Sequence, residues 1–435
     1  MTLSPRKNLF GSLGGNSLEF YDFAVYSFLI TQISHNFFPA NASSFNETFT
    51  FLVFALGYLS RPFASLLFGH IGDKYGRTKA LKHSIILSTI ATVCIGLTPS
   101  YESIGLLSPF ILIICRLLQG IAVSGEEGGA VVYLCESLKY GNGLIGSLIQ
   151  SSVFVGLLVG SGLCALITTF LSSQAMLEWG WRLPFVLALP LGYAAYFIRK
   201  QSQDSPIFTD LKNKKKLEAN PAKTLFQQHK TQLIPMILLV SSFSASSSVL
   251  VVFLPKILST NLQLAQANIM KIGCLNFMAS IILFPIIGRL CDKYSAELIS
   301  LIGFMLFVIL SVPMFSMLNE SASTSMLGVF LSWYLISYAL VAAPLFAILS
   351  ESFAPAIRYT GVSLSYNISA ATFNGLTPAL LSAISIKAPS QLSAGIWISL
   401  TALISLFSLV YARKDRLKNI ISLQSHSYGG SHERV

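Results

Sequence analysis

Charged residues are scarce in this chain of 435 residues. Asp, Glu, Lys and Arg together make up 11% of it, whereas hydrophobic residues make up 53%. Ordinary soluble domains carry roughly 25% charged residues, so this chain has too few charges to cover a soluble surface of its own size. We therefore expect an integral membrane protein, most of whose surface faces lipid.

The sequence also lacks the motifs of an ATP-driven pump, an intramembrane enzyme or a metal site. It contains no GxxxxGKS/T phosphate loop, no HExxH and no GxSxG, and its six histidines are scattered. None of the six cysteines stands in a CxxC or Cys/His spacing, so we interpret them as packing residues. The net charge of +11 is not gathered on motifs that bind phosphates or bases. We expect no enzyme, no cofactor and no nucleic-acid partner.

What the chain does have is long apolar runs, and a run of roughly 20 such residues spans the hydrocarbon core as a helix. They predict an all-α membrane protein with twelve transmembrane helices in two six-helix bundles. The first six are expected at 10–38, 48–70, 80–99, 106–135, 143–171 and 182–199, and the second six at 231–258, 265–289, 296–318, 324–350, 356–385 and 391–412. The predicted domains are the bundles 1–199 and 231–413, a linker at 200–230 and a tail at 414–435.

Lysine and arginine are distributed unevenly between the two sides that this topology defines. One side holds Arg6, Lys7, the linker lysines from Lys212 to Lys223 and the Arg413 to Lys418 group, and the other holds little beyond Arg182, Lys256, Lys271 and Lys387. Cytoplasmic loops carry the excess of positive charge. We therefore expect a multi-pass protein of the cell inner membrane with both termini and the linker in the cytoplasm.

The two halves resemble each other at matched places. Gly69, Asp73, Lys74 and Tyr75 recur as Gly288, Asp292, Lys293 and Tyr294, and Leu134, Glu136 and Ser137 recur as Leu349, Glu351 and Ser352. Repeated halves with a site between them are an architecture of transporters, which alternate access by rocking one half against the other. The repeat therefore favours a carrier over a channel or a receptor, which remain alternatives on topology alone.

The first predicted helix carries two acids, and Asn16, Glu19, Asp22 and Tyr26 share one of its faces. A carboxylate at bilayer depth is costly unless it meets water, a partner or a proton, so it is a candidate functional group. Such a group can bind and release a proton as its exposure changes. The alternative is a structural ion pair that ties helices together.

Arg61 and Arg116 are the cations that we expect to face the interior. Each can neutralise a first-helix carboxylate or hold a substrate carboxylate through its planar fork of donors. Glu126 lies about 15 Å along a regular helix from Arg116, too far for a direct pair. The candidate substrate- and proton-binding residues are Asn16, Glu19, Asp22, Tyr26, Arg61, Arg116, Gln119, Glu126 and Glu127.

A second group of candidates belongs to a gate in the hairpin GHIGDKYGRTK, which begins at Gly69. We expect Asp73 to lie against a helix N-terminus of the other half, where its charge is favoured, and Arg77 to pair with Glu136. Such contacts would hold the cytoplasmic side shut. The candidate gate residues are Gly69, Gly72, Asp73, Gly76, Arg77, Glu136, Asp292, Glu351 and Arg358.

These motifs resemble the major facilitator superfamily, and more closely its metabolite:proton symporter branch, which includes proline/betaine transporters and α-ketoglutarate permeases. The resemblance rests on GNSLEFYDFAVYSF from Gly15, the hairpin from Gly69, RLLQGIAVSGEEGGA from Arg116 and RYTGVSLSYNISAATFNGLTP from Arg358. It implies a major facilitator fold with a central cavity, symport driven by the proton gradient, and Asp73 and Arg77 as gate residues.

The chain departs from the branch in three places. Glu127 stands where the branch has an uncharged residue, the second hairpin GRLCDKYSAE lacks the closing Gly and Arg, and the tail shows no heptad repeat. The missing heptads argue against the coiled-coil tail of osmosensing relatives.

We therefore expect proton-coupled symport of a small polar metabolite, either an amino acid or betaine or an organic carboxylate, by a monomer that binds its substrate, protons and the bilayer. Proton-coupled efflux of a drug- or siderophore-like compound is the alternative.

Overall fold

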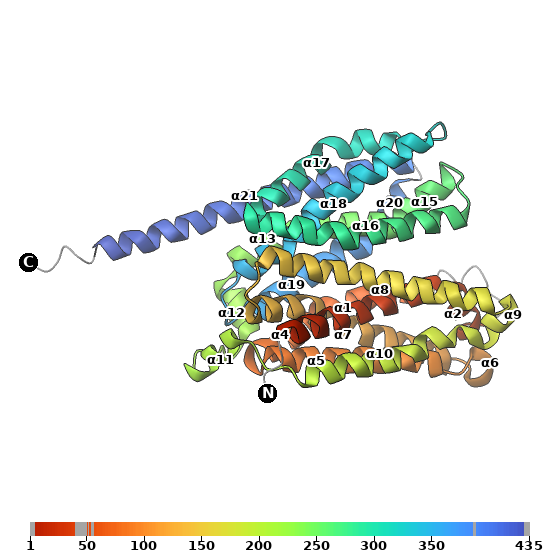
Figure 1. Cartoon of the computed structure of the whole chain (residues 1–435), viewed down its shortest axis with the longest axis horizontal. Helices are drawn as coiled ribbons and strands as arrows, with labels where there is room; N and C mark the ends of the chain where they lie inside the picture. Colours follow the sequence, from red (N-terminus) through yellow and green to blue (C-terminus); the bar gives the residue numbers. More distant parts are fainter. Residues whose placement is uncertain (1–4, 40–49, 51, 54–55, 386–388, 430–435) are drawn as a thin grey trace, which may run out of the picture.

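The computed structural model describes residues 5–39, 50, 52–53, 56–385 and 389–429. Within them the chain folds into two helical bundles that lie side by side, one built from each half of the sequence (Figure 1). Lys387, residues 430–435 of the predicted tail and parts of the second predicted helix lie outside the described residues, as do the side chains of Arg6, Lys7, Arg416 and Lys418.

The first bundle contains seven of the longer helical segments. They are α1 (Pro5–Phe28), α2 (Ile30–Phe37), α4 (Arg61–Lys74), α5 (Arg77–Leu97), α7 (Leu107–Ser137), α8 (Asn142–Phe170) and α10 (Arg182–Lys200). The short segments α6 (Tyr101–Ile104), α9 (Ser173–Ala175) and the π-helical turn η2 (Met176–Gly180) connect them.

The second bundle begins with one crossing in four pieces, α13 (Lys230–Leu239), α14 (Ser241–Ser248), η3 (Val249–Phe253) and α15 (Leu254–Thr260). It continues with α16 (Gln266–Lys293), α17 (Ala296–Ser316) and α18 (Thr324–Ser352). The next crossing is α19 (Arg358–Ser369), η4 (Ala370–Asn374) and α20 (Gly375–Ile384), and α21 (Ser390–Gly429) is the last. Figure 1 shows α21 projecting beyond the bundle as it continues past the predicted membrane segment.

Eight helices in the described residues are long and apolar enough to cross a membrane, and a ninth is if Ser173–Gly180 and Arg182–Lys200 form one bent span. Three further predicted crossings complete the twelve among the described segments. Of these, α1 carries two acids and a π-helical turn divides α19 from α20, while the crossing that ends in α4 is described only in part.

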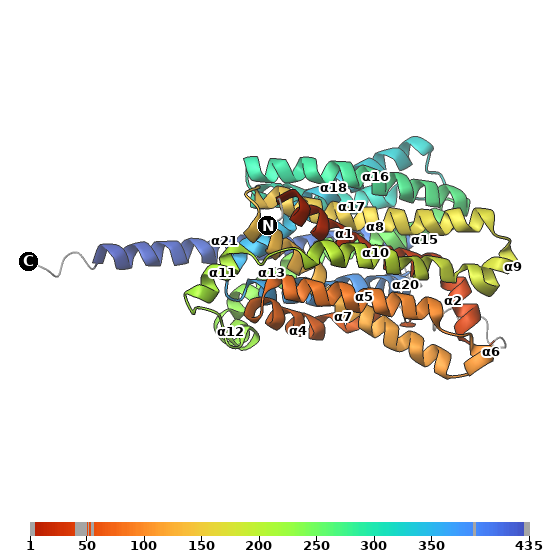
Figure 2. The ribbon, with the colours of Figure 1, turned by 60° about the horizontal axis from the view of Figure 1, so that its bottom comes forward.

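Small residues let the two bundles approach along the seam between α8 and α16 (Figures 1 and 2). A Cβ added at Gly143 would lie 2.6 Å from the carbonyl oxygen of Gly288, and one at Gly288 would meet Ser147. Close backbone approach of this kind is how helices pack tightly in lipid. A second seam joins α19 of one bundle to α4 and α7 of the other.

Two short helices occupy the segment between the bundles, α11 (Pro206–Asn213) and α12 (Pro221–Gln228). Each begins with a side-chain cap, since Ser205 accepts from the amide of Phe208 and Asn220 accepts from the amide of Lys223. Helix α11 packs on α7, and α12 packs on α4, α13 and α19. We call the end of the molecule where α11 and α12 lie the linker end (Figure 2).

Candidate functional site

The predicted face of α1 lies inside the first bundle, and its four residues are at most 3% exposed. Asn16 donates to Ser152 Oγ at 2.9 Å and to the carbonyl oxygen of Ile149 at 3.2 Å, so it ties α1 to α8. The hydroxyl of Tyr26 donates to the carbonyl oxygen of Thr50 at 3.2 Å. These two polar groups therefore join helices, while the two acids lie between them on the same face.

Asp22 is linked to Arg116 through two intervening side chains. Thr92 and Ser88 of α5 donate their hydroxyls to Asp22 Oδ2, the latter at 3.1 Å. Gln119 Nε2 donates to Thr92 Oγ1 at 2.7 Å, and Arg116 Nη1 donates to Gln119 Oε1 at 2.7 Å. A continuous chain of hydrogen bonds therefore connects the carboxyl group of Asp22 with the guanidinium of Arg116.

Both interior arginines lie against aromatic rings. The guanidinium carbon of Arg61 is 4.1 Å from the ring centre of Tyr58 and 4.9 Å from that of Phe23. That of Arg116 is 4.0 Å from the ring centre of Tyr26 and 5.4 Å from that of Phe23. Cation–π contacts hold both guanidiniums at fixed places in a desolvated interior, and Phe23 contacts both.

Glu126 forms a buried ion pair with Arg199, which the sequence did not single out. Arg199 Nη1 donates to Glu126 Oε2 at 2.6 Å, Nη2 makes a second, closer contact with Oε1, and Ser84 donates to Oε2 at 2.7 Å. Arg199 also donates to the carbonyl oxygens of Leu81 and Ser12. The charge of Glu126 is therefore matched inside the first bundle, where the pair ties α7 to α10.

The other two acids have different surroundings. Among the described residues, neither carboxyl oxygen of Glu19 has a hydrogen-bond partner, although the residue is only 1% exposed. Glu127 is equally buried and faces Tyr366 of α19, in the opposite half. In the described part of the chain, three interior carboxyl groups form no ion pair, namely those of Glu19, Asp22 and Glu127.

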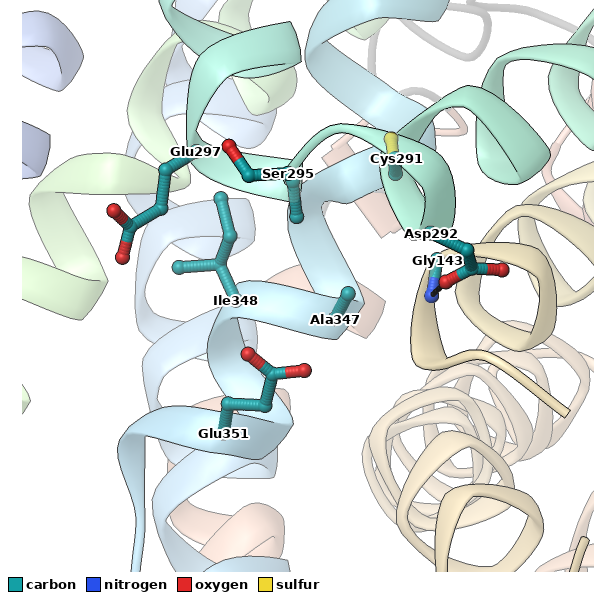
Figure 3. A pocket seen from close by; sticks show the side chains of 9 residues that line it. Gly143, Cys291, Asp292, Ser295, Glu297, Ala347, Ile348 and Glu351 are labelled. Atoms are coloured by element: carbon teal, nitrogen blue, oxygen red, sulfur yellow. Dashed lines mark hydrogen bonds between the residues drawn. The ribbon is translucent and has the colours of Figure 1, made fainter. Parts of the chain in front are cut away.

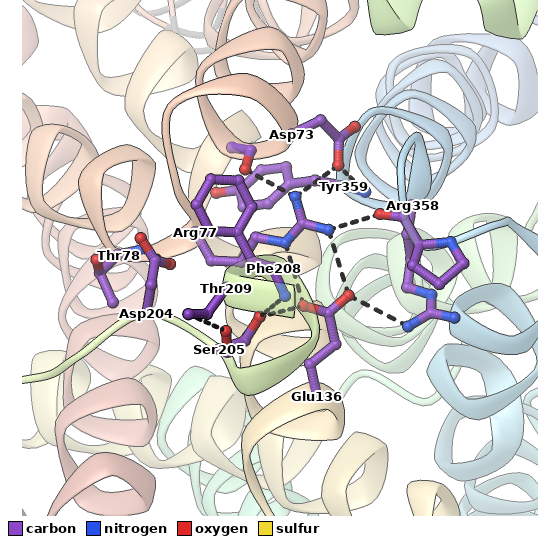
Figure 4. Close-up of polar contacts among 12 residues, drawn as sticks. Asp73, Arg77, Thr78, Glu136, Asp204, Ser205, Phe208, Thr209, Arg358 and Tyr359 are labelled. Carbon is purple, nitrogen blue, oxygen red and sulfur yellow. Dashed lines mark hydrogen bonds and ion pairs between the residues drawn. The ribbon is translucent and has the colours of Figure 1, made fainter. Parts of the chain in front are cut away.

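Asp73 joins the two halves at the linker end (Figure 4). Its Oδ1 accepts from the amide of Tyr359 at 3.1 Å, and its Oδ2 accepts from the amide of Thr360 at 2.9 Å and from the Thr360 hydroxyl at 2.7 Å. These amides belong to the first turn of α19, where the helix dipole favours a negative charge. The predicted contact with a helix N-terminus of the other half is confirmed.

Arg77 connects Asp73 to Glu136, as predicted. Its Nη1 donates to Asp73 Oδ1 at 2.8 Å and its Nε donates to Glu136 Oε2 at 3.2 Å. Its Nη2 donates to the carbonyl oxygen of Pro355 in the other half at 2.7 Å. Arg358 Nη1 donates to Glu136 Oε1 at 3.2 Å, so an ion pair also crosses between the halves.

The linker completes this group, which sequence reasoning missed. Ser205 donates to Glu136 Oε2 at 2.5 Å, and the ring centre of Phe208 is 5.3 Å from the Arg77 guanidinium (Figure 4). Asp204 accepts from the amide of Thr78 at 3.1 Å. The Asp-Ser-Pro sequence signals the start of α11, but it does not indicate that this helix lies against the gate.

The three predicted gate glycines lie where the backbone must approach other groups closely. A Cβ on Gly69 would lie 2.8 Å from Thr360 Cα, and one on Gly72 would lie 2.6 Å from Cγ of Tyr359. Gly76 has φ of 124°, in the region that favours glycine, and its side faces Asp204. Larger residues would push α19 away from α4.

The remaining gate candidates, Asp292 and Glu351, form a separate group on the other seam. Asp292 accepts from the amides of Gly143 and Leu144 at 2.7 and 3.0 Å, and Glu351 accepts from Asn142 Nδ2 at 2.9 Å. The structure thus divides the predicted gate into two sets of contacts between the halves.

The chain matches the family model described as sugar (and other) transporter over residues 7–232 and 211–414. It is 32% identical over 392 residues to the proline/betaine transporter of Escherichia coli K12, covering 86% of this chain and 77% of that protein. It is also 32% identical over 386 residues to the glycine betaine/proline/ectoine/pipecolic acid transporter OusA of Dickeya dadantii, covering 86% and 76%. The solved structure of the proton:xylose symporter XylE, of the major facilitator superfamily, superimposes with a TM-score of 0.79 over 94% of this chain and 95% of that one, at 15% identity.

Proposed function

The chain belongs to the sugar (and other) transporter family of the major facilitator superfamily, and on this premise we propose that it is a proton-coupled symporter of a small zwitterion of the proline or betaine kind. It is a multi-pass membrane transporter and not an enzyme. We place it in the cell inner membrane with both termini and the linker end in the cytoplasm, and we expect it to work as a monomer.

The observation that carries the proposal is the chain of hydrogen bonds from Asp22 to Arg116. When Asp22 is ionised it accepts the Thr92 hydroxyl, which orients Gln119 and with it the guanidinium. A proton on Asp22 weakens that acceptor, and in this scheme Arg116 then turns its donors toward a substrate carboxylate. Substrate binding and proton binding favour each other in this scheme, which is the requirement for symport.

The other half of a zwitterion carries a positive charge. Glu19 and Glu127 offer negative charge within the interior, and Glu127 points toward the seam between the bundles, where Tyr366 faces it. Arg61 supplies a second interior cation, whose guanidinium lies against the rings of Tyr58 and Phe23. Opposite charges at separated places are the arrangement that recognises an amino acid or a betaine.

Access to this site is governed by contacts that cross between the halves. Opening the linker end must break the hydrogen bonds of Asp73 with α19, the bond from Arg77 to Pro355 and the pair between Arg358 and Glu136. The pairs of Arg77 with Asp73 and Glu136 lie within the first half and survive. They keep both carboxylates neutralised after the halves separate, so opening exposes no unpaired buried charge.

Uptake into proteoliposomes tests the proposal. Labelled proline, glycine betaine, a dicarboxylate and xylose are each offered with and without an imposed inward proton gradient. We expect proline or betaine to accumulate above its outside concentration only under the gradient. Accumulation of the dicarboxylate alone would overturn the zwitterion assignment. Accumulation driven only by a reversed gradient would replace import by efflux.

A further inference from the structure

The two seams of the linker end are closed by related sets of residues. We name Asp73, Arg77, Glu136 and Arg358 the first latch, and Asp292, Ala296, Glu351 and Asn142 the second latch. Asp292 and Ala296 follow Asp73 and Arg77 by 219 positions, and Glu351 follows Glu136 by 215. Arg358 follows Asn142 by 216, so all four positions correspond under the internal repeat.

The hydrogen bonds confirm this correspondence independently of the sequence. Asp73 accepts from two consecutive amides, those of Tyr359 and Thr360 in the first turn of α19. Asp292 likewise accepts from two consecutive amides, those of Gly143 and Leu144 in the first turn of α8. Each half therefore uses one aspartate to hold the start of a helix in the other half.

The latches differ in their cations. In the first, Arg77 and Arg358 balance the charges of Asp73 and Glu136. In the second, the corresponding residues are Ala296 and Asn142, which carry no charge. Asn142 still donates to Glu351, but no ion pair among the described residues includes Asp292 or Glu351.

A cavity occupies the place that corresponds to the guanidinium of Arg77. It measures about 360 Å³ and is lined by Asp292, Ala296 and Glu351, with Gly143, Cys291, Ser295, Glu297, Ala347 and Ile348 completing the wall. Figure 3 shows Asp292 and Glu351 on opposite sides of this space. Ala296 is the first residue of α17, just as Arg77 is the first residue of α5, so a longer side chain there would extend from the same point of its helix.

We propose that the second latch is weaker than the first, because it lacks both arginines, and that this weakness lets the linker end open during each cycle. The inference rests on the proposed alternating-access function. Each latch holds a helix start through an aspartate, but the first adds the ion pair of Arg358 with Glu136 and the bond from Arg77 to the Pro355 carbonyl oxygen across its seam. The second adds only the bond from Asn142 to Glu351, and three carboxyl side chains, those of Asp292, Glu297 and Glu351, line its cavity. Opening therefore starts at the seam between α8 and α16.

The test installs the missing cation that would cross the seam with Asn142→Arg, which faces Glu351 of the other half, and measures opening directly. Cys135 of α7 lies against Ser350 of α18, across the seam, so its reaction with an impermeant maleimide from the linker side reports opening. The other five cysteines are replaced by serine or alanine. We expect Asn142→Arg to slow labelling by about two- to fivefold, because Glu351 is exposed and exposed ion pairs stabilise only weakly. Substrate turnover should fall while the substrate concentration for half-maximal rate changes little.

Two matched variants separate the effect of the ion pair from the effect of side-chain size. Asn142→Gln keeps the amide on a longer side chain without charge and should label nearly as the wild type does. Glu351→Gln in the Asn142→Arg background removes the carboxylate partner and should restore most of the labelling rate. Equal labelling of Asn142→Arg and Asn142→Gln would overturn the proposal. Labelling needs no substrate, so the difference in labelling rate between the variants remains measurable even if the transport assay shows that the proposed substrate class is wrong.

Discussion

Replacing Arg77 by Gln should shift the transporter toward the state that is open at the linker end. Arg77 is fully buried and donates to Asp73, Glu136 and the carbonyl oxygens of Gly72 and Pro355. Glutamine has one amide with two donor hydrogens and no charge, so it satisfies at most two of these acceptors. Two buried carboxylates then lose their shared cation.

The size of the shift follows from which contacts the two states share. Removing one partner of a buried ion pair costs about 3–5 kcal/mol in total. The open state escapes part of that cost, because separating the halves admits water to both carboxylates. We assign the closed state an excess penalty of about 1.5–3 kcal/mol, the value of hydrogen bonds to charged groups. At 1.4 kcal/mol for each factor of ten, the open population should rise roughly tenfold to a hundredfold.

Maleimide labelling of Cys135 in the protein without other cysteines measures this shift, and uptake kinetics accompany it. Labelling of Arg77→Gln should be faster by about the factor above, with a lower maximal rate and a nearly unchanged half-saturating concentration, because the change acts on the gate. Lys79→Gln removes a neighbouring exposed cation of α5 and is the control. If Arg77→Gln labels and transports like Lys79→Gln, the assignment of Arg77 to the gate is refuted.

Three further outcomes follow from other contacts. Asp22→Asn should abolish gradient-driven accumulation yet keep substrate counterflow, since the coupling carboxyl is lost while the substrate route remains; retained accumulation would remove Asp22 from coupling. Arg199→Gln should lower unfolding stability by about 3–5 kcal/mol by leaving Glu126 buried without its cation, and adding Glu126→Gln should recover much of the loss in detergent melting. Additive losses in the double variant would contradict the pair. Gly129→Ala places a methyl group against the hydroxyl of Tyr359 in α19 and should speed Cys135 labelling, whereas unchanged labelling would argue against tight closure at that seam.

The gate was largely predictable from the sequence because its geometry is local and repeated. Asp73 and Arg77 are four residues apart across one hairpin, and the repeat located Asp292 and Glu351. The same offsets relate each gate residue of one half to its counterpart in the other half. The contribution of Ser205 and Phe208 could not be predicted, because the path of a polar linker depends on tertiary packing that carries no periodic signal.

The interior site was less predictable. The acids of α1 stood out because charge is rare in the membrane, but Thr92 and Ser88 did not, since single hydroxyls are common in apolar helices. Their spacing of four with Ser84 on α5 was the available signal. Arg199 was missed because it ends its helix beside Lys200, where the positive-inside pattern alone accounts for a basic residue. Only the fold shows its side chain turned inward to Glu126.

Proton movement that accompanies substrate entry tests the central claim most directly. Proteoliposomes that contain a pH-sensitive dye are given proline or glycine betaine with no imposed proton gradient. The account predicts that the interior acidifies on addition of the transported substrate, that Asp22→Asn abolishes this signal, and that xylose produces none. Substrate entry without any change of internal pH would contradict proton-coupled symport.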